Sequence, residues 1–230
     1  MEFQISLLNS VLPSFATGLG GLYTAFSLLS RKQKDKEKIS FAFSWFLMGS
    51  VFFLTGLRIT AFATGAPELD KNLFYALEIC TGLAAGPMMY HVAWKLTRNQ
   101  KLTIIFTLFA AICGLLFIFF VFKEGVTGPK ILVSGSEYTP PTKASFFFIL
   151  PSIIGLIIVT IDLIKRAIQF FIRKKEFKSE KFLSSLSFFI FVTTAGFDQL
   201  GFDTGWNLVI MRIFLMISAL IASISYSSVE

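Results

Sequence analysis

Seven long apolar stretches follow one another along the chain, and short polar segments separate them. Each stretch is continuous rather than alternating, as in FFFILPSIIGLIIV at 146–159, which argues against transmembrane β-strands. A helix of roughly 20 apolar residues crosses a hydrocarbon core about 30 Å thick. The pattern therefore predicts an all-α polytopic membrane protein with transmembrane helices at about 5–30, 40–63, 72–95, 102–122, 145–171, 181–200 and 204–226.

The boundary between the last two helices is the least defined of these predictions. Residues 181–225 form one apolar stretch that is interrupted by Asp198, Gly201, Asp203 and Gly205. Such an interruption predicts a tight turn at the membrane surface.

Composition agrees with the hydropathy pattern. Hydrophobic residues make up 54% of the chain and charged residues 15%, and the mean hydropathy is +0.71. Globular domains carry about 25% charged residues, so this chain lacks the polar surface of a soluble enzyme or a disordered protein. The net charge of +7 does not indicate nucleic-acid binding, because the basic residues lie in short runs between apolar stretches.

The distribution of Lys and Arg predicts the orientation. Most of the 21 basic residues lie in three alternate loops, around 31–38, 95–101 and 165–181. The opposite loops hold only Lys71, Lys123, Lys130 and Lys143. The positive-inside rule then places the N-terminus outside and the C-terminus in the cytoplasm, as expected for an integral protein of the plasma (cytoplasmic) membrane. Since Glu2 is the only charge before the first apolar stretch, we expect a mature span rather than a signal peptide.

The longest loop is expected at 123–144, on the outer side. Its sequence, KEGVTGPKILVSGSEYTPPTKA, is rich in Gly, Pro and Ser, which predicts an irregular segment. It could form a solvated cover or a lid that contacts a ligand.

A weak internal repeat relates the first three helices to the last three. Leu12-Pro13-Ser14 corresponds to Leu150-Pro151-Ser152. At a constant offset of 140, Gly56, Phe62, Thr64 and Gly65 match Gly196, Phe202, Thr204 and Gly205. Chance agreement is the alternative. A true repeat would make residues 1–230 one 3+1+3 domain, with units at 1–96 and 145–226 joined by a linker helix at 102–122.

In this architecture the chain resembles the transporter-opsin group of seven-helix proteins, which includes microbial rhodopsins, SWEET-type sugar carriers, PnuC-type vitamin carriers and the KDEL receptor. The retinal-binding members need a lysine in the last helix, and this chain has none after Lys181. The Pro-Gln dipeptide of the sugar carriers is also absent. The resemblance therefore implies no retinal, and the single histidine, His91, argues against haem ligated by two histidines. No cofactor is expected.

A charged residue inside a predicted span is energetically unfavourable, so each one marks a candidate functional position. Five of them fall at a similar depth in the outer half: Arg58, Glu78, Asp198, Asp203 and Arg212. The repeat aligns Arg58 with Asp198 at the offset of 140 and Glu78 with Arg212 at an offset of 134, which predicts ion pairs between acids and arginines. Arginine suits such pairs because its planar fork stays charged.

Two interpretations of this outer cluster stay open. The pairs could fix helix registry or reach the interface, which is a structural role. They could also form a polar ligand pocket or an external gate, in which Tyr75 and Trp206 supply an aromatic wall.

Prolines and small residues mark candidate bends and seams. Pro13, Pro87 and Pro151 lie within predicted helices and could act as hinges or simply shape the packing. The run TGLGG at 17–21 predicts a close helix–helix seam, within the chain or between subunits. Asp162 is expected to pair with Lys165 or Arg166.

Three classes of function remain. A small-solute carrier should contain a polar cavity near mid-membrane lined by both three-helix units. A ligand-binding sensor should act through a separate effector partner. An accessory subunit should bury apolar faces against other chains. Expected partners are membrane lipids, a small-molecule ligand, and a second copy or a membrane complex, without nucleic acid. No catalytic motif favours an enzyme.

Overall fold

A computed structural model describes residues 2–31, 35–132, 135–171, 179–199 and 206–225. These residues form seven helices and one β-hairpin. The helices are α1 (Glu2–Leu29), α2 (Lys36–Ala63), α3 (Pro67–Thr97), α4 (Gln100–Glu124), α5 (Thr142–Phe171), α6 (Ser179–Gln199) and α7 (Trp206–Ser225), and the strands are β1 (Thr127–Leu132) and β2 (Gly135–Thr139). The predicted helical fold with seven helices is confirmed. The tight turn predicted between the last two helices lies outside the described residues.

Local signals explain several helix boundaries. The Asp35 side chain accepts a hydrogen bond from Lys38 N at 2.7 Å and caps the start of α2. Asn99 caps α4 in the same way, and Pro67 begins α3, where a missing N–H costs nothing. Arg98 ends α3 in the left-handed region, with φ 51°.

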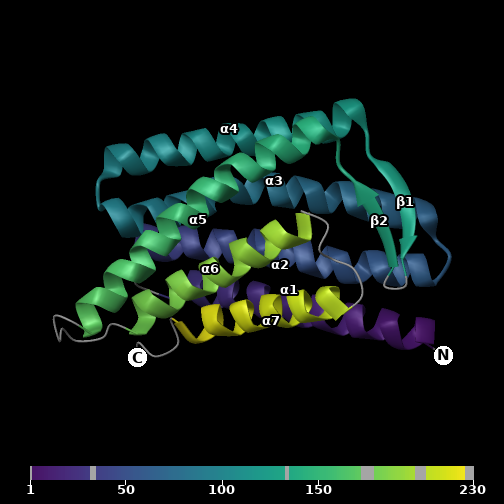
Figure 1. Ribbon diagram of the computed structural model, residues 1–230, viewed down its shortest axis with the longest axis horizontal. Helices are drawn as coiled ribbons and strands as arrows, with labels where there is room; N and C mark the ends of the chain where they lie inside the picture. Colours follow the sequence, from purple (N-terminus) through teal and green to yellow (C-terminus); the bar gives the residue numbers. More distant parts are fainter. Residues whose placement is uncertain (1, 32–34, 133–134, 172–178, 200–205, 226–230) are drawn as a thin grey trace.

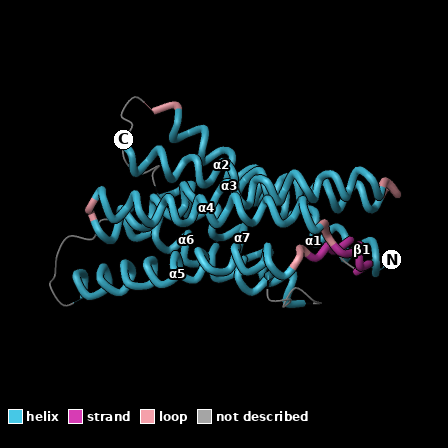
Figure 2. Tube along the Cα trace, turned by 90° about the horizontal axis from the view of Figure 1, so that it is seen from above, coloured by secondary structure: helices cyan, strands magenta, loops and turns pink. Residues whose placement is uncertain are grey.

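The helices pack as a ring in which each neighbours the next in sequence. Helix α7 closes the ring on α1, and α3 also packs directly on α5. Successive helices run in opposite directions along the bundle (Figures 1 and 2). We call the end that carries the hairpin and the start of α1 the outer end. The basic α1–α2 and α3–α4 connections lie together at the opposite, inner end (Figure 1).

The bundle exposes large apolar residues on its outside and buries small polar residues within its apolar core. On α4, Ile105, Leu108 and Leu115 are more than half exposed, whereas Ser14 and Ser44 are fully buried. Their hydroxyls donate to the backbone carbonyls of Ser10 and Ser40 in the preceding turn, at 2.8 and 2.7 Å. Helices that are apolar toward the outside and small or polar inside are typical of proteins whose exterior faces lipid.

Three helices are long and apolar enough to cross a membrane: Lys36–Ala63, Gln100–Glu124 and Thr142–Gln169. Within the described part of α6 and α7, the apolar segments Lys181–Gly196 and Ile210–Ser225 are shorter. The membrane character predicted from the sequence is therefore supported for these three helices.

The small-residue run at 17–21 forms a seam inside the chain. A Cβ on Gly18 would lie 2.6 Å from Phe53 N, and one on Gly21 would lie 2.9 Å from Gly49 Cα. Helices α1 and α2 therefore touch backbone to backbone here, which only glycine allows. Gly82 and Gly114 form a similar contact between α3 and α4.

The prediction of an irregular segment at 123–144 is wrong in part. Helix α4 continues to Glu124, and β1 and β2 pair as an antiparallel hairpin, with Lys130 opposite Glu137. The hairpin packs on α2 (Figure 1). Its conformation is set by this tertiary contact and by strand pairing, which composition alone does not report.

The internal repeat stays a prediction. If α1, α2 and α3 correspond to α5, α6 and α7, each helix has equivalent neighbours in the two units. In particular, α1 packs on α7, and its counterpart α5 packs on α3. Ser14 and Ser152, which follow the matched prolines, each bond the carbonyl four residues earlier.

Candidate functional site

A buried ion pair joins α2 to α3 near the outer end. Arg58 Nε lies 3.0 Å from Asp70 Oδ1, and the two residues are 8% and 1% exposed. The guanidinium carbon also lies 4.7 Å from the centroid of the Phe74 ring and 5.3 Å from that of Tyr138. Arg58 is thus held by one carboxylate and two aromatic faces.

The hairpin completes this outer cluster. The backbone oxygen of Ser136 on β2 accepts a hydrogen bond from Arg58 Nη2 at 3.2 Å, and the Ser136 hydroxyl donates to Asp70 Oδ2. Burial, together with the Asp70 carboxylate, raises the pKa of Tyr138 on the same strand, so its hydroxyl stays protonated. The arrangement is a closed clamp that fastens the hairpin to α2 and α3.

The partner of Arg58 is a residue that the sequence analysis missed. We predicted that Arg58 would pair with an acid inside the spans, whereas its ion pair is with Asp70, in the first turn of α3. Asp70 lies just before the span predicted at 72–95, so it was not considered. The spacing of Asp70, Phe74 and Glu78 is the signal that could have found it, because residues four apart share a helix face.

The other predicted site residues are distributed differently. Glu78 is buried on α3 and adds to the favourable electrostatic field at Arg58. Tyr75 packs against Phe122 of α4, with ring centroids 5.1 Å apart. The Arg212 guanidinium of α7 lies 5.8 Å from the centroid of the Phe52 ring.

The remaining predicted residues cannot be placed in the cluster. The side chains of Asp198, Asp203 and Trp206 lie outside the described residues. The predicted pair between Asp198 and Arg212 therefore stays a prediction.

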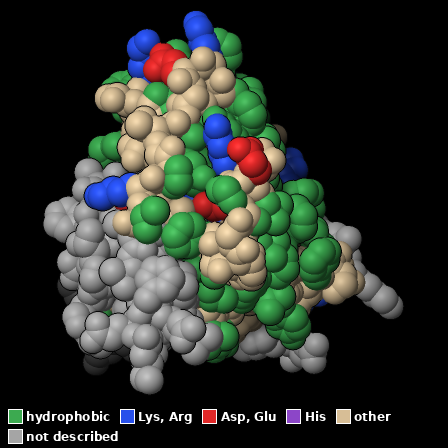
Figure 3. Space-filling model, turned by 90° about the vertical axis from the view of Figure 1, so that its right-hand side faces the viewer, with side chains coloured by type: hydrophobic (Ala, Val, Ile, Leu, Met, Phe, Trp, Pro, Cys, Tyr) green, Lys and Arg blue, Asp and Glu red, His purple; other side chains and the backbone are tan. Residues whose placement is uncertain are grey.

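The outer surface above the cluster carries charges of both signs among apolar side chains (Figure 3). Lys143 Nζ lies 2.8 Å from Glu124 Oε1, and both residues are partly exposed. Such an exposed pair contributes little stability, about 0–1 kcal/mol.

An apolar cavity lies deeper in the bundle, between α3, α4, α5 and α6. About 700 Å³ of space not filled by protein atoms lies within it and at its mouth, open solvent included. Its wall is formed mainly by methionine, phenylalanine and small residues, including Met48, Met89, Phe117, Phe148, Pro151 and Phe191. Arg58, Glu78 and Arg212 do not line it.

The hydroxyls in the cavity wall are already satisfied. Thr81 Oγ1 donates to Leu77 O at 3.0 Å, and Ser152 Oγ donates to Phe148 O at 2.8 Å. Hydroxyls that bond their own helix offer little to a polar solute. The wall therefore suits an apolar molecule, whereas we expected a polar cavity.

The course of α5 shapes the cavity. This helix crosses the bundle obliquely, from the end of α4 at the outer end to the start of α6 at the inner end (Figure 1). Its lining residues run from Phe147 to Val159, a distance of about 18 Å at helical rise. Of the predicted hinges, Pro151 lies in this wall, and Pro13 and Pro87 lie within α1 and α3.

Gly155 and Gly196 lie in the cavity wall and leave space in the cavity unfilled. A Cβ on Gly155 would meet only the Met89 methyl, at 3.8 Å, and one on Gly196 would meet nothing within 4 Å. A larger side chain at either position would extend into the empty space without striking the backbone.

A polar network closes the inner end of the bundle. Lys95 of α3 is 4% exposed, and its Nζ donates to Lys181 O at 3.0 Å and to Ser185 Oγ at 3.1 Å on α6. Ser185 in turn donates to Asp162 Oδ2 of α5 at 2.7 Å. Helices α3, α5 and α6 are thereby joined below the cavity.

Asp162 also makes the local pair predicted from the sequence. Arg166 Nε and Nη2 donate to its two oxygens, at 2.7 and 3.0 Å. The role of Lys95 was missed, because a basic residue beside a predicted loop was counted only toward topology.

Comparison with known proteins gives the chain no family. No protein-family model, curated protein or solved structure matches it.

Proposed function

We propose that this chain is a multi-pass membrane protein that binds an elongated apolar molecule in the cavity between α3, α4, α5 and α6. In this proposal all seven helices cross the plasma membrane, with the outer end outside and the C-terminus in the cytoplasm. Binding would act as a signal to a separate partner, as expected of a sensor.

The chemistry of the cavity wall carries this proposal. A polar solute entering the cavity would lose its hydrogen bonds to water and find the wall hydroxyls already bonded to their helix. An apolar molecule loses nothing comparable and gains contacts with Met48, Met89 and Phe191. Methionine side chains adapt to irregular ligands because they are flexible and polarisable.

The polar groups at both ends support lateral entry from the lipid. The outer cluster of Arg58, Asp70 and Ser136 and the inner network of Lys95 and Asp162 each close one end of the bundle. An apolar molecule already dissolved in the bilayer has no need to pass either of them.

A carrier for the same apolar molecule is the second candidate. The equivalent neighbour relations of the two three-helix units favour it, since rocking of such units is a common mode of alternating access.

Tryptophan quenching tests the proposal. Trp45 is 1% exposed and packs on Phe191 of the cavity wall, with ring centroids 5.8 Å apart. In a variant with Trp94→Phe and Trp206→Phe, Trp45 is the only fluorophore of its kind. We expect 1-bromododecane in lipid vesicles to quench it saturably, because a buried indole is reached only from inside the bundle.

Two further variants make the test specific. Gly155→Leu together with Gly196→Leu fills the cavity and should abolish saturable quenching. Ala16→Leu places a leucine on an exposed face of α1 instead and should leave quenching unchanged. Absence of saturable quenching in the parent protein would contradict the proposal.

A further inference from the structure

Among the described residues, four buried side-chain polar atoms form no hydrogen bond: Trp45 Nε1, His91 Nε2, Thr193 Oγ1 and Arg212 Nε. The first two lie in one aromatic cluster. Trp45 is 1% exposed and His91 is fully buried. Buried polar atoms are nearly always paired, so each of these needs an explanation.

The two atoms have complementary chemistry. His91 Nδ1 lies 3.2 Å from the backbone oxygen of Glu37. A carbonyl oxygen only accepts, so Nδ1 carries the proton and the Nε2 of a neutral ring is an acceptor. The indole Nε1–H of Trp45 is a donor only. One unused donor and one unused acceptor are therefore present.

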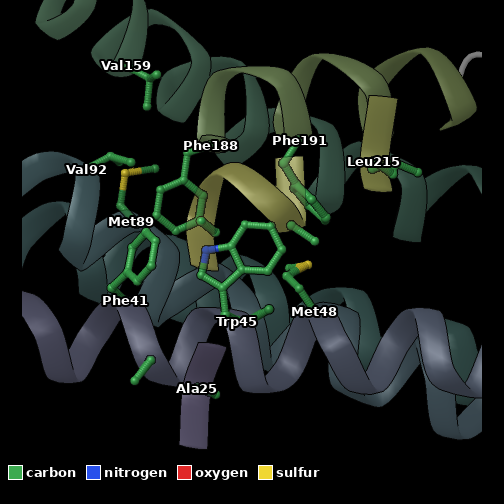
Figure 4. Close-up of a cluster of buried hydrophobic side chains, with 14 of the residues drawn as sticks. Ala25, Phe41, Trp45, Met48, Met89, Val92, Val159, Phe188, Phe191 and Leu215 are labelled. Atoms are coloured by element: carbon green, nitrogen blue, oxygen red, sulfur yellow. The ribbon is translucent and has the colours of Figure 1, made fainter. Parts of the chain in front are cut away.

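Both atoms belong to one aromatic cluster. The Phe41 ring centroid lies 4.8 Å from that of His91 and 6.3 Å from that of Trp45. The Phe188 centroid lies 5.1 and 6.2 Å from the same two rings. Figure 4 shows the nitrogen-bearing edge of Trp45 turned toward Phe41 and Phe188. We call Phe41, Trp45, His91 and Phe188 the aromatic floor.

The aromatic floor lies behind the inner part of the cavity wall: none of its four residues lines the cavity, but each of three of them neighbours a lining residue on its own helix. Trp45 lies one helical turn before Met48 on α2, Phe188 lies one turn before Phe191 on α6, and His91 lies between Met88 and Val92 on α3. Helices α2 and α6 run from the inner to the outer end, so Trp45 and Phe188 lie on the inner side of these two lining residues (Figure 1).

We propose that the aromatic floor binds a hydroxyl group at one end of the apolar ligand. The hydroxyl would accept a hydrogen bond from Trp45 Nε1 and donate one to His91 Nε2, while the chain fills the cavity between Met89 and Phe148. A hydroxyl can do both, whereas a ketone can only accept. A carboxylate would bring a charge into an apolar interior. This inference rests on the proposed function and names its ligand class as long-chain or polycyclic alcohols.

Competition binding tests the inference. Full-length protein in lipid vesicles is loaded with tritiated 1-dodecanol, and unlabelled 1-dodecanol, dodecane and dodecanoic acid compete at equal concentration in the lipid phase. One net hydrogen bond favours the alcohol over dodecane by about tenfold. Trp45→Phe and His91→Phe each keep an aromatic ring but remove one polar atom, and should reduce this preference to about twofold.

The outcomes separate the two proposals. Equal displacement by 1-dodecanol and dodecane in the parent protein would overturn the hydroxyl site and leave the apolar cavity intact. Stronger displacement by dodecanoic acid would also overturn it. If no compound displaces the label saturably, the proposed function fails as well. Retained dodecane competition in the two variants shows that they fold with an intact cavity, so an unchanged alcohol preference there contradicts the inference.

Discussion

Replacing Asp70 by alanine is expected to lower the free energy of unfolding by about 3–5 kcal/mol, because it leaves the buried Arg58 without its partner. Arg58 is 8% exposed, so water cannot replace the lost carboxylate. The hairpin would also lose the hydrogen bond from Ser136 to Asp70. The measurement is reversible unfolding of the detergent-solubilised protein, followed by circular dichroism.

A matched variant separates the ion pair from the hairpin contact. Ser136→Ala removes hydroxyl contacts but keeps the ion pair, and should cost about 1 kcal/mol. If Asp70→Ala costs no more than Ser136→Ala, the outer cluster contributes no buried ion pair to stability.

Replacing Gly49 by alanine is expected to cost about 2–3 kcal/mol, at the upper end of the range for overpacking. The added Cβ would lie 2.7 Å from Leu22 N and 2.9 Å from Gly18 O. These are backbone atoms, so relief requires α1 and α2 to move apart. Thermal unfolding in detergent measures the effect.

Gly20→Ala is the control for this seam. A Cβ there would meet Ala219 Cβ at 3.6 Å, an ordinary contact. Alanine is also the better helix former by about 1 kcal/mol, so this variant should be neutral or slightly stabilising. Equal effects at Gly49 and Gly20 would contradict the close packing of α1 against α2.

The sequence predicted the helices well because a helix that crosses a membrane needs about 20 consecutive apolar residues, and such a stretch is visible directly in the sequence. The predicted span 102–122 corresponds to α4 at Gln100–Glu124, and 145–171 corresponds to α5 at Thr142–Phe171. Errors of a few residues arise where caps such as Asn99 extend a helix beyond its apolar segment.

The candidate site was predicted less well, for identifiable physical reasons. Asp70 was missed because a polar first turn does not register as part of an apolar span, although it is helical and buried. The cavity depends on the oblique course of α5, and helix tilt is set by packing rather than by hydropathy. The seam at 17–21 was predicted, but only the structure shows that its partner is Gly49 of the same chain.

Photolabelling with a diazirine-bearing dodecane tests the central claim most directly. After irradiation in lipid vesicles, mass spectrometry maps the labelled residues with and without excess dodecane. We expect competitor-sensitive label at Met89, Phe148 and Phe191 of the cavity wall, and competitor-insensitive label at the exposed Ile105 and Leu115. Label confined to the exposed face of α4 and other exposed positions, with no competitor-sensitive fraction, would show that the cavity takes up no apolar molecule and would contradict the account.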